Sequence, residues 1–181
     1  SAASDVYKRQ IIDLNKTQFM DIKSTSSVVL TNLTIINGYT KYGGAIYNNG
    51  NLTIQNCNFK NNSATSGGAI YSGTSANLDI YYSTFEDNVV TARGGAIFSY
   101  SYVGIYDSTF IRNKGTGTSS TGGSIYINGN SNKYSVLNRN IFKDTSVARQ
   151  GGAIYLSYGN VTNCIFELSL IHISEPTRRS W

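Results

Sequence analysis

The chain has 181 residues, of which 40% are hydrophobic and 14% are charged, and its formal net charge is +5 at pH 7. It contains no run of about 18 apolar residues, which excludes a membrane-spanning helix in this part of the protein. Its basic residues are scattered rather than clustered, so the composition does not indicate a nucleic-acid partner.

The two ends of the chain differ from the sequence between them. Residues 1–10 read SAASDVYKRQ and residues 168–178 read LSLIHISEPTR. Both segments resemble in-frame translations of the transposase adapters used to prepare sequencing libraries. We therefore expect residues 1–10 and 168–181 to be non-native tails and residues 11–167 to be the natural segment. Removing the tails takes away four basic and two acidic residues, which lowers the net charge from +5 to +3.

Between the tails, the pattern G-G-[AS]-I-[YF] occurs five times, at intervals of about 24 to 29 residues. A repeat of this period indicates a solenoid, in which each coil is too small to fold alone and is buried by its neighbours. The copies are Gly43–Tyr47, Gly67–Tyr71, Gly94–Phe98, Gly122–Tyr126 and Gly151–Tyr155.

A second motif, Phe-x-x-Asn, follows in the coils at Phe59–Asn62, Phe85–Asn88 and Phe110–Asn113, with Phe142–Thr145 as a variant. Apolar and polar residues alternate before it, as in Asn51–Ile54, and this period of two predicts short strands. The sequence therefore predicts an all-β protein, a right-handed parallel β-helix of about six coils without substantial helix. Equivalent residues of successive coils would stack about 4.8 Å apart.

This register predicts several columns of side chains. The Ile of each glycine motif and the Phe of each second motif form inner columns. We expect the Asn of Phe-x-x-Asn at a corner, where Asn tolerates a left-handed conformation and bonds to the backbone of neighbouring coils. Opposite charges alternate along an outer column. The predicted neighbours are Lys60 with Glu86, Lys143 with Glu167, and Arg112 with both Asp87 and Asp144.

The register also separates the two cysteines. Cys57 and Cys164 are equivalent residues four coils apart, or about 19 Å. A disulfide requires Cα atoms within about 7 Å, so we expect no bridge and a small interior position for each cysteine.

The two motifs together resemble the polymorphic outer-membrane protein repeat. The longer pattern N-L-T-I-x-N-x-x-F-x-N-N-x-A-x-x-G-G-A-I-Y, which Asn51–Tyr71 carries almost in full, resembles the adhesin-like surface proteins of gut methanogens. The resemblance covers residues 28–167. It implies a right-handed β-helix on a secreted or surface-attached protein with an adhesive role, in contact with glycans or with proteins of a host or neighbouring cell.

The natural segment has no recognisable catalytic or metal motif. With His172 assigned to the tail it lacks histidine, which excludes Ser-His-Asp and Cys-His nucleophiles and zinc motifs such as H-E-x-x-H. We expect no enzyme activity, cofactor, metal or membrane insertion for this fragment.

Two alternative functions remain open. One is a carbohydrate-active, lyase- or hydrolase-like β-helix, which needs carboxylates clustered on adjacent rungs. The other is a passenger segment of an autotransporter-like protein.

The aromatic residue that ends each glycine motif marks the candidate binding site. Strand alternation places it opposite the inner Ile, so the sequence predicts an aromatic column on the outer face. The column has two interpretations: a ligand-facing surface for sugars or a partner, or a stack of rings that shields the sheet. Its members are Tyr47, Tyr71, Phe98, Tyr126 and Tyr155.

Overall fold

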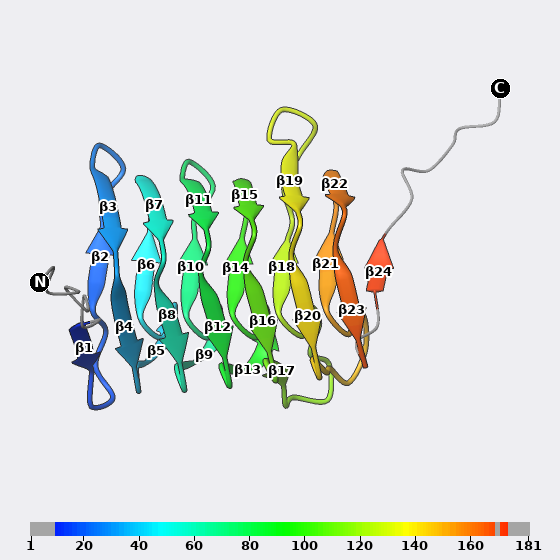
Figure 1. Cartoon of the computed structure of the whole chain (residues 1–181), viewed down its shortest axis with the longest axis horizontal. Helices are drawn as coiled ribbons and strands as arrows, with labels where there is room; N and C mark the ends of the chain where they lie inside the picture. Colours follow the sequence, from blue (N-terminus) through cyan, green and yellow to red (C-terminus); the bar gives the residue numbers. More distant parts are fainter. Residues whose placement is uncertain (1–9, 169–170, 174–181) are drawn as a thin grey trace, which may run out of the picture.

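The computed structural model describes residues 10–168 and 171–173, which wind around one axis in about six turns (Figure 1). The strands pair in parallel, and none of these residues is helical. The predicted all-β parallel β-helix is therefore confirmed. A complete turn passes through four sheets, which we call B, C, A and D in the order in which the chain visits them.

Sheets A and B run the whole length of the described helix. Sheet A consists of β1 (Gln10–Asp13), β4 (Leu33–Ile36), β8 (Asn58–Lys60), β12 (Thr84–Glu86), β16 (Thr109–Ile111), β20 (Ile141–Lys143) and β23 (Ile165–Glu167). Sheet B consists of β2 (Met20–Ile22), β6 (Ile46–Asn48), β10 (Ile70–Ser72), β14 (Ile97–Ser99), β18 (Ile125–Ile127), β21 (Ile154–Leu156) and β24 (Ile171–Ile173).

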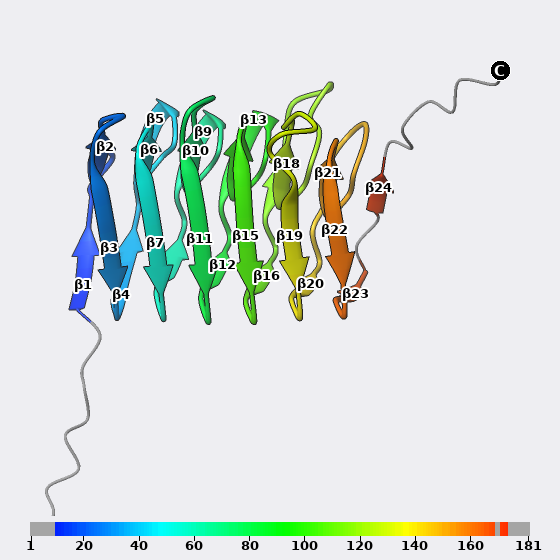
Figure 2. The same ribbon diagram turned by 90° about the horizontal axis from the view of Figure 1, so that it is seen from above.

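Sheet C, which faces the viewer in Figure 2, is followed along the chain by sheet A, and sheet D is the shortest of the four. Sheet C consists of β3 (Ser27–Thr31), β7 (Asn51–Gln55), β11 (Asn77–Tyr81), β15 (Tyr102–Tyr106), β19 (Ser135–Asn138) and β22 (Gly159–Thr162). Sheet D consists of β5 (Tyr39–Tyr42), β9 (Ser63–Ser66), β13 (Val89–Arg93) and β17 (Lys114–Gly115).

Identical residues face one another across neighbouring coils, as the repeat predicts. Ile70 pairs in register with Ile97, and Phe85 pairs with Phe110. Both columns are buried except at Phe166, which is half-buried, and the Phe rings stack with centroids 4.9 to 5.0 Å apart from β8 to β23. Burying a column of large apolar side chains gives each coil a hydrophobic core that it could not form alone.

The glycine pair makes the corner between sheets D and B. The first Gly of each pair has a positive φ of 63° to 66°, a conformation that Gly adopts without steric cost. The second Gly allows neighbouring backbones to approach: a Cβ on Gly95 would lie 1.9 Å from the carbonyl oxygen of Gly123. Each glycine of the pair is therefore required for a different reason.

The buried Asn residues of Phe-x-x-Asn bond to the backbone of a neighbouring coil, as predicted, and also to one another in a ladder. Asn62 Nδ2 donates to Asn88 Oδ1 at 3.1 Å, and Asn88 Nδ2 donates to Asn113 Oδ1 at 2.9 Å. The expected left-handed conformation belongs, however, to the residue before each Asn. Asp87 has φ 53° and Arg112 has φ 50°, so the chain turns one residue before the ladder. This shift leaves the Asn side chain pointing inward.

A small interior position lies two residues before each Phe. Cys57 N–H donates to Ser83 Oγ at 3.1 Å, and Ser83 N–H donates in turn to Ser108 Oγ at 3.1 Å. Cys164 is half-buried in the last equivalent position and is not joined to Cys57 by a disulfide, as predicted.

Residues 114–121 and 128–133 lengthen the fourth coil, and the loop between β18 and β19 projects beyond the other turns (Figure 1). The predicted tails lie mostly outside the described residues, and their non-native origin stays a prediction. Within the range assigned to the C-terminal tail, the backbone of β24 pairs with β21 and extends sheet B.

Candidate functional site

The five predicted aromatic residues form one continuous column on the outer face of sheet B. Neighbouring rings are nearly parallel, at interplanar angles of 3° to 12°, and their centroids lie 4.5 to 5.2 Å apart. Because the strands stack in register, each ring covers part of the faces of its neighbours. The stacking therefore leaves mainly the ring edges uncovered by the column itself.

Further side chains cover the centre of the column. The ring of Tyr100 stands edge-on to Phe98, with centroids 4.7 Å apart, and the Arg93 guanidinium lies 5.5 Å from the ring centroid of Tyr126. Phe98 is 1% exposed and Tyr126 9% exposed, whereas Tyr47, Tyr71 and Tyr155 are half-buried.

Burial raises the pKa of Tyr71 to about 12, so its hydroxyl stays protonated at neutral pH. Whether the column faces a ligand stays a prediction. The accessible surface for such contact belongs to Tyr47, Tyr71 and Tyr155.

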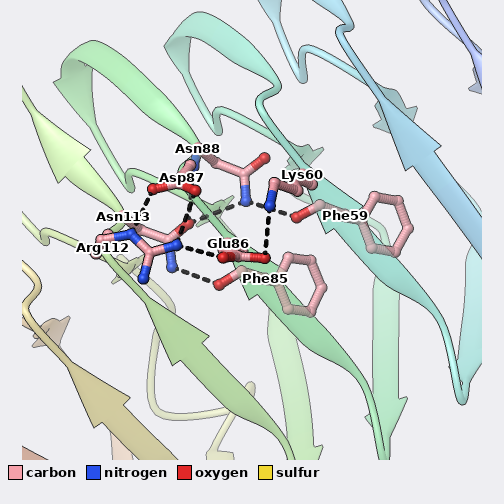
Figure 3. Close-up of polar contacts among 8 residues, drawn as sticks. All are labelled: Phe59, Lys60, Phe85, Glu86, Asp87, Asn88, Arg112 and Asn113. Atoms are coloured by element: carbon pink, nitrogen blue, oxygen red, sulfur yellow. Dashed lines mark hydrogen bonds and ion pairs between the residues drawn. The ribbon is translucent and has the colours of Figure 1, made fainter.

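A ladder of ion pairs follows the corner between sheets A and D (Figure 3). Lys60 Nζ lies 3.1 Å from Glu86 Oε2, and Arg112 holds both oxygens of Asp87, at 2.8 and 2.9 Å, while also pairing with Glu86. This arrangement confirms the predicted neighbours of Glu86 and Asp87. Asp144 is the predicted register neighbour of Arg112 on the other side, since Ile111 pairs with Lys143, but the guanidinium turns to the preceding coil.

Two further pairs form in the same way, of which Lys143 with Glu167 is among the predicted neighbours. Lys143 Nζ lies 2.8 Å from Glu167, and Arg139 Nε lies 2.6 Å from Asp107 Oδ1. The hydrogen bonds from Arg112 and Arg139 hold the pKa values of Asp87 and Asp107 below their usual range. These carboxylates therefore stay ionised and engaged within the fold, which leaves them poorly suited to proton transfer.

Asp79 has a different environment. It lies half-buried on the outer face of β11, where Tyr102 donates a hydrogen bond to its Oδ1 at 3.2 Å. Burial raises the pKa of this carboxyl, although the Tyr102 hydrogen bond partly opposes the shift. The contact between Tyr102 and Asp79 does not follow from the repeat, because it joins two different columns. The glycine at position 104, inside a strand, was the available signal, because glycine in a strand often marks a close approach.

A hollow of about 440 Å³ lies at the corner of the first coils. It exists where the chain passes from β1 to β2 without adding a strand to sheet D. Gln18 occupies part of the vacant edge and donates to the carbonyl oxygens of Tyr42 and Gly43 at 2.9 and 2.6 Å. The lining includes Asp13, Asn15, Lys16, Asn37, Tyr39 and Asn61.

Among the residues that the structure describes, no group of three or more His, Cys, Asp or Glu side chains could hold a metal ion. The same part of the chain contains no helix long and apolar enough to cross a membrane.

Parallel sheets joined by short corners, with stacked inner columns, define the class of parallel β-helix proteins. Residues 19–173 match the family described as the right-handed β-helix region, and the chain belongs to that family. The right-handed winding predicted from the sequence is thereby confirmed. A comparison with curated proteins and with solved structures gives no significant match.

Proposed function

We propose that this chain is a segment of a secreted or cell-surface adhesin-like protein built from polymorphic outer-membrane protein repeats. In this proposal the β-helix is a stiff stalk, and its outer face contacts glycans or proteins of a host or neighbouring cell. One observation carries the proposal: an aromatic column runs in register over five coils on the outside of a solenoid. Tyrosine offers an apolar ring and a polar hydroxyl, a combination that suits both sugars and protein surfaces.

The charge pattern supports a scaffold. Glu86, Asp87 and Asp107 each pair with a basic side chain of a neighbouring coil. Such pairs connect successive rungs and satisfy the carboxylates internally. A glycosidase-type site instead needs two carboxyl groups about 5 to 9.5 Å apart, with one of them free to exchange a proton.

A glycan array and a cell-binding assay with the full chain test the proposal. We expect binding that weakens about tenfold or more when Tyr47 and Tyr71 are both replaced by Ser, because aromatic contacts commonly dominate such surfaces. Tyr158→Ser is the matched control, since Tyr158 is exposed and lies outside the column. Binding that is unchanged in the double variant, while circular dichroism shows an intact β-fold, would remove the column from the proposal.

The carbohydrate-active alternative is tested in parallel. Incubation with plant and microbial polysaccharides, followed by measurement of new reducing ends and of unsaturated products, separates the two functions. Cleavage that is lost in Asp79→Asn would favour the enzyme, since Asp79 is the half-buried carboxyl whose pKa is raised.

A further inference from the structure

Asp79 lies among three tyrosines on the outer face of sheet C. Tyr81 occupies the same face of β11, and its ring stacks on that of Tyr106 in β15, with centroids 5.2 Å apart. Tyr102, at the start of β15, donates its hydroxyl proton to Asp79 Oδ1. The carboxylate and the three phenol side chains thus lie on one face of two neighbouring strands, and we call this group the Asp79 cluster (Asp79, Tyr81, Tyr102 and Tyr106).

Gly104 makes this arrangement possible. It pairs in register with Asp79. A Cβ at this position would lie 2.6 Å from both Asp79 Oδ1 and the Tyr102 hydroxyl oxygen, and 3.1 Å from the Tyr106 ring. Any other residue would therefore push the Tyr102 phenol away from the carboxylate. The neighbouring coils place Thr53 and Val136 in the same column, and neither carries a charge.

The Asp79 carboxylate lacks a cationic partner within residues 10–168. The other half-buried acids of this range, Glu86, Asp87 and Asp107, each form an ion pair with Lys or Arg. Asp79 receives one neutral hydrogen bond instead, and none of the described residues donates to its Oδ2. A partly desolvated anion without a counter-charge is costly, and groups of this kind concentrate at binding sites.

From this geometry we propose that the Asp79 cluster binds a ligand ammonium group. An ammonium has three donors and no acceptor, so it complements a carboxylate that lies beside the Tyr102 phenol oxygen. It also supplies the missing positive charge, and hydrogen bonds to a charged partner are roughly twice as strong as neutral ones. Anionic ligands are disfavoured because they would place like charges together.

The inference adds a second site, on sheet C, to the aromatic column of sheet B, and it rests on the proposed function for its biological role. Two kinds of ligand at a cell surface carry an ammonium group, namely amino sugars and lysine side chains. The two sources share the chemistry on which the Asp79 cluster acts, and the experiment below separates them.

Titration of the chain by calorimetry and by NMR tests the inference. The probes are glucosamine and Nα-acetyl-lysine amide, and their uncharged counterparts are N-acetylglucosamine and Nα-acetyl-norleucine amide. We expect at least one charged probe to bind about tenfold or more tightly than its counterpart, as a charge-assisted hydrogen bond predicts. The shifted resonances should include Tyr102 and Tyr106. Whichever charged probe binds identifies the source.

Variants locate the site. Asp79→Asn keeps the shape and removes the charge, and Tyr102→Phe removes the neighbouring hydroxyl; each should reduce binding of the charged probe. Asp107→Asn is the matched control, because Asp107 lies in the next coil and already pairs with Arg139. Should Asp79→Asn fail to fold, as judged by circular dichroism, Tyr102→Phe alone decides the site.

Two results would overturn the inference. The first is equal binding of charged and uncharged probes, or binding of neither. The second is an equal loss of binding in Asp79→Asn and Asp107→Asn. If Asp79→Asn shows either result and still binds glycans or cells, the proposed function stands, and the ammonium group is rejected as the ligand of the Asp79 cluster. Ammonium binding without any cell or glycan binding would support this ligand and contradict the proposed function.

Discussion

Asn88 makes four side-chain hydrogen bonds although it is fully buried. Its amide nitrogen donates to the carbonyl of Phe59 at 3.0 Å and to Asn113 Oδ1, and its oxygen accepts from the backbone and side chain of Asn62. One residue therefore connects three coils. Buried polar groups are tolerated only when they are bonded in this way, which explains why the repeat keeps Asn here.

Replacing Asn88 with Ala should destabilise the protein by about 3 kcal/mol or more. The change leaves buried groups of Phe59 and Asn62 without a partner, and each such loss costs about 1 to 3 kcal/mol. Urea unfolding followed by circular dichroism measures the effect. Asn132→Ala is the control, since Asn132 is exposed in the β18–β19 loop and should change stability by less than about 0.5 kcal/mol. Equal effects of the two variants would contradict the ladder as a source of stability.

Asp87 and Asp79 should respond to pH with opposite signs. Arg112 lowers the pKa of Asp87 in the folded state, so this carboxylate stabilises the fold above its unfolded pKa, and the effect disappears as the pH falls through the lowered value. Burial raises the pKa of Asp79, so ionised Asp79 disfavours folding once the pH rises through the raised value.

Two Asn substitutions test these signs. At pH 7, Asp87→Asn should lower stability and Asp79→Asn should raise it, each by less than about 1 kcal/mol because both sites are partly solvated. Asn also tolerates the positive φ of Asp87, so the backbone is not perturbed. The differences in stability between each variant and the unmodified protein should shrink below about pH 4, where ordinary aspartates are protonated. Unfolding curves across pH 3 to 7 measure them, and a destabilised Asp79→Asn at pH 7 would contradict the assignment.

At the scale of strands, the repeat predicted which residues of neighbouring coils stack on one another. Ile70 lies against Ile97, and Lys60 lies beside Glu86, because equivalent residues share one register along the axis. Contacts between different columns did not follow from the repeat. Tyr100 covers Phe98, and Tyr102 reaches Asp79, through side chains outside the aligned positions. The register was therefore predictable from the sequence, whereas the exposure of the aromatic column and the Asp79 cluster required the three-dimensional structure.

The close approach of strands at the glycine pairs gives a further prediction. Gly95→Ala should prevent folding or destabilise by several kcal/mol, because its Cβ would meet the Gly123 carbonyl oxygen and the Lys114 amide nitrogen, at 1.9 and 2.8 Å. Gly129→Ala is the control, since Gly129 lies in a loop and its nearest neighbour would be 3.0 Å away. Soluble yield and thermal unfolding measure both variants, and a stable Gly95→Ala would show that neighbouring coils can separate without loss of structure.

For the whole molecule, stability depends on the number of neighbours that each coil has. In a solenoid the folding free energy is approximately a sum of coil terms and nearest-neighbour interface terms. Phe85 stacks between Phe59 and Phe110 and is fully buried. Phe166 stacks on Phe142, belongs to the last strand of sheet A and is half-buried. The same substitution at the two sites therefore removes different numbers of interfaces.

Phe85→Ala should destabilise the protein by about 3 to 5 kcal/mol, the usual cost of a large cavity in a core, whereas Phe166→Ala should cost less than half as much. Hydrogen exchange should show the same gradient. We expect the amides of β12 to exchange only on global unfolding, while those of β23 exchange through local opening of the last coil. Equal costs at the two sites, with uniform protection along the chain, would mean that the coils unfold as one unit and that the nearest-neighbour description does not apply to this β-helix.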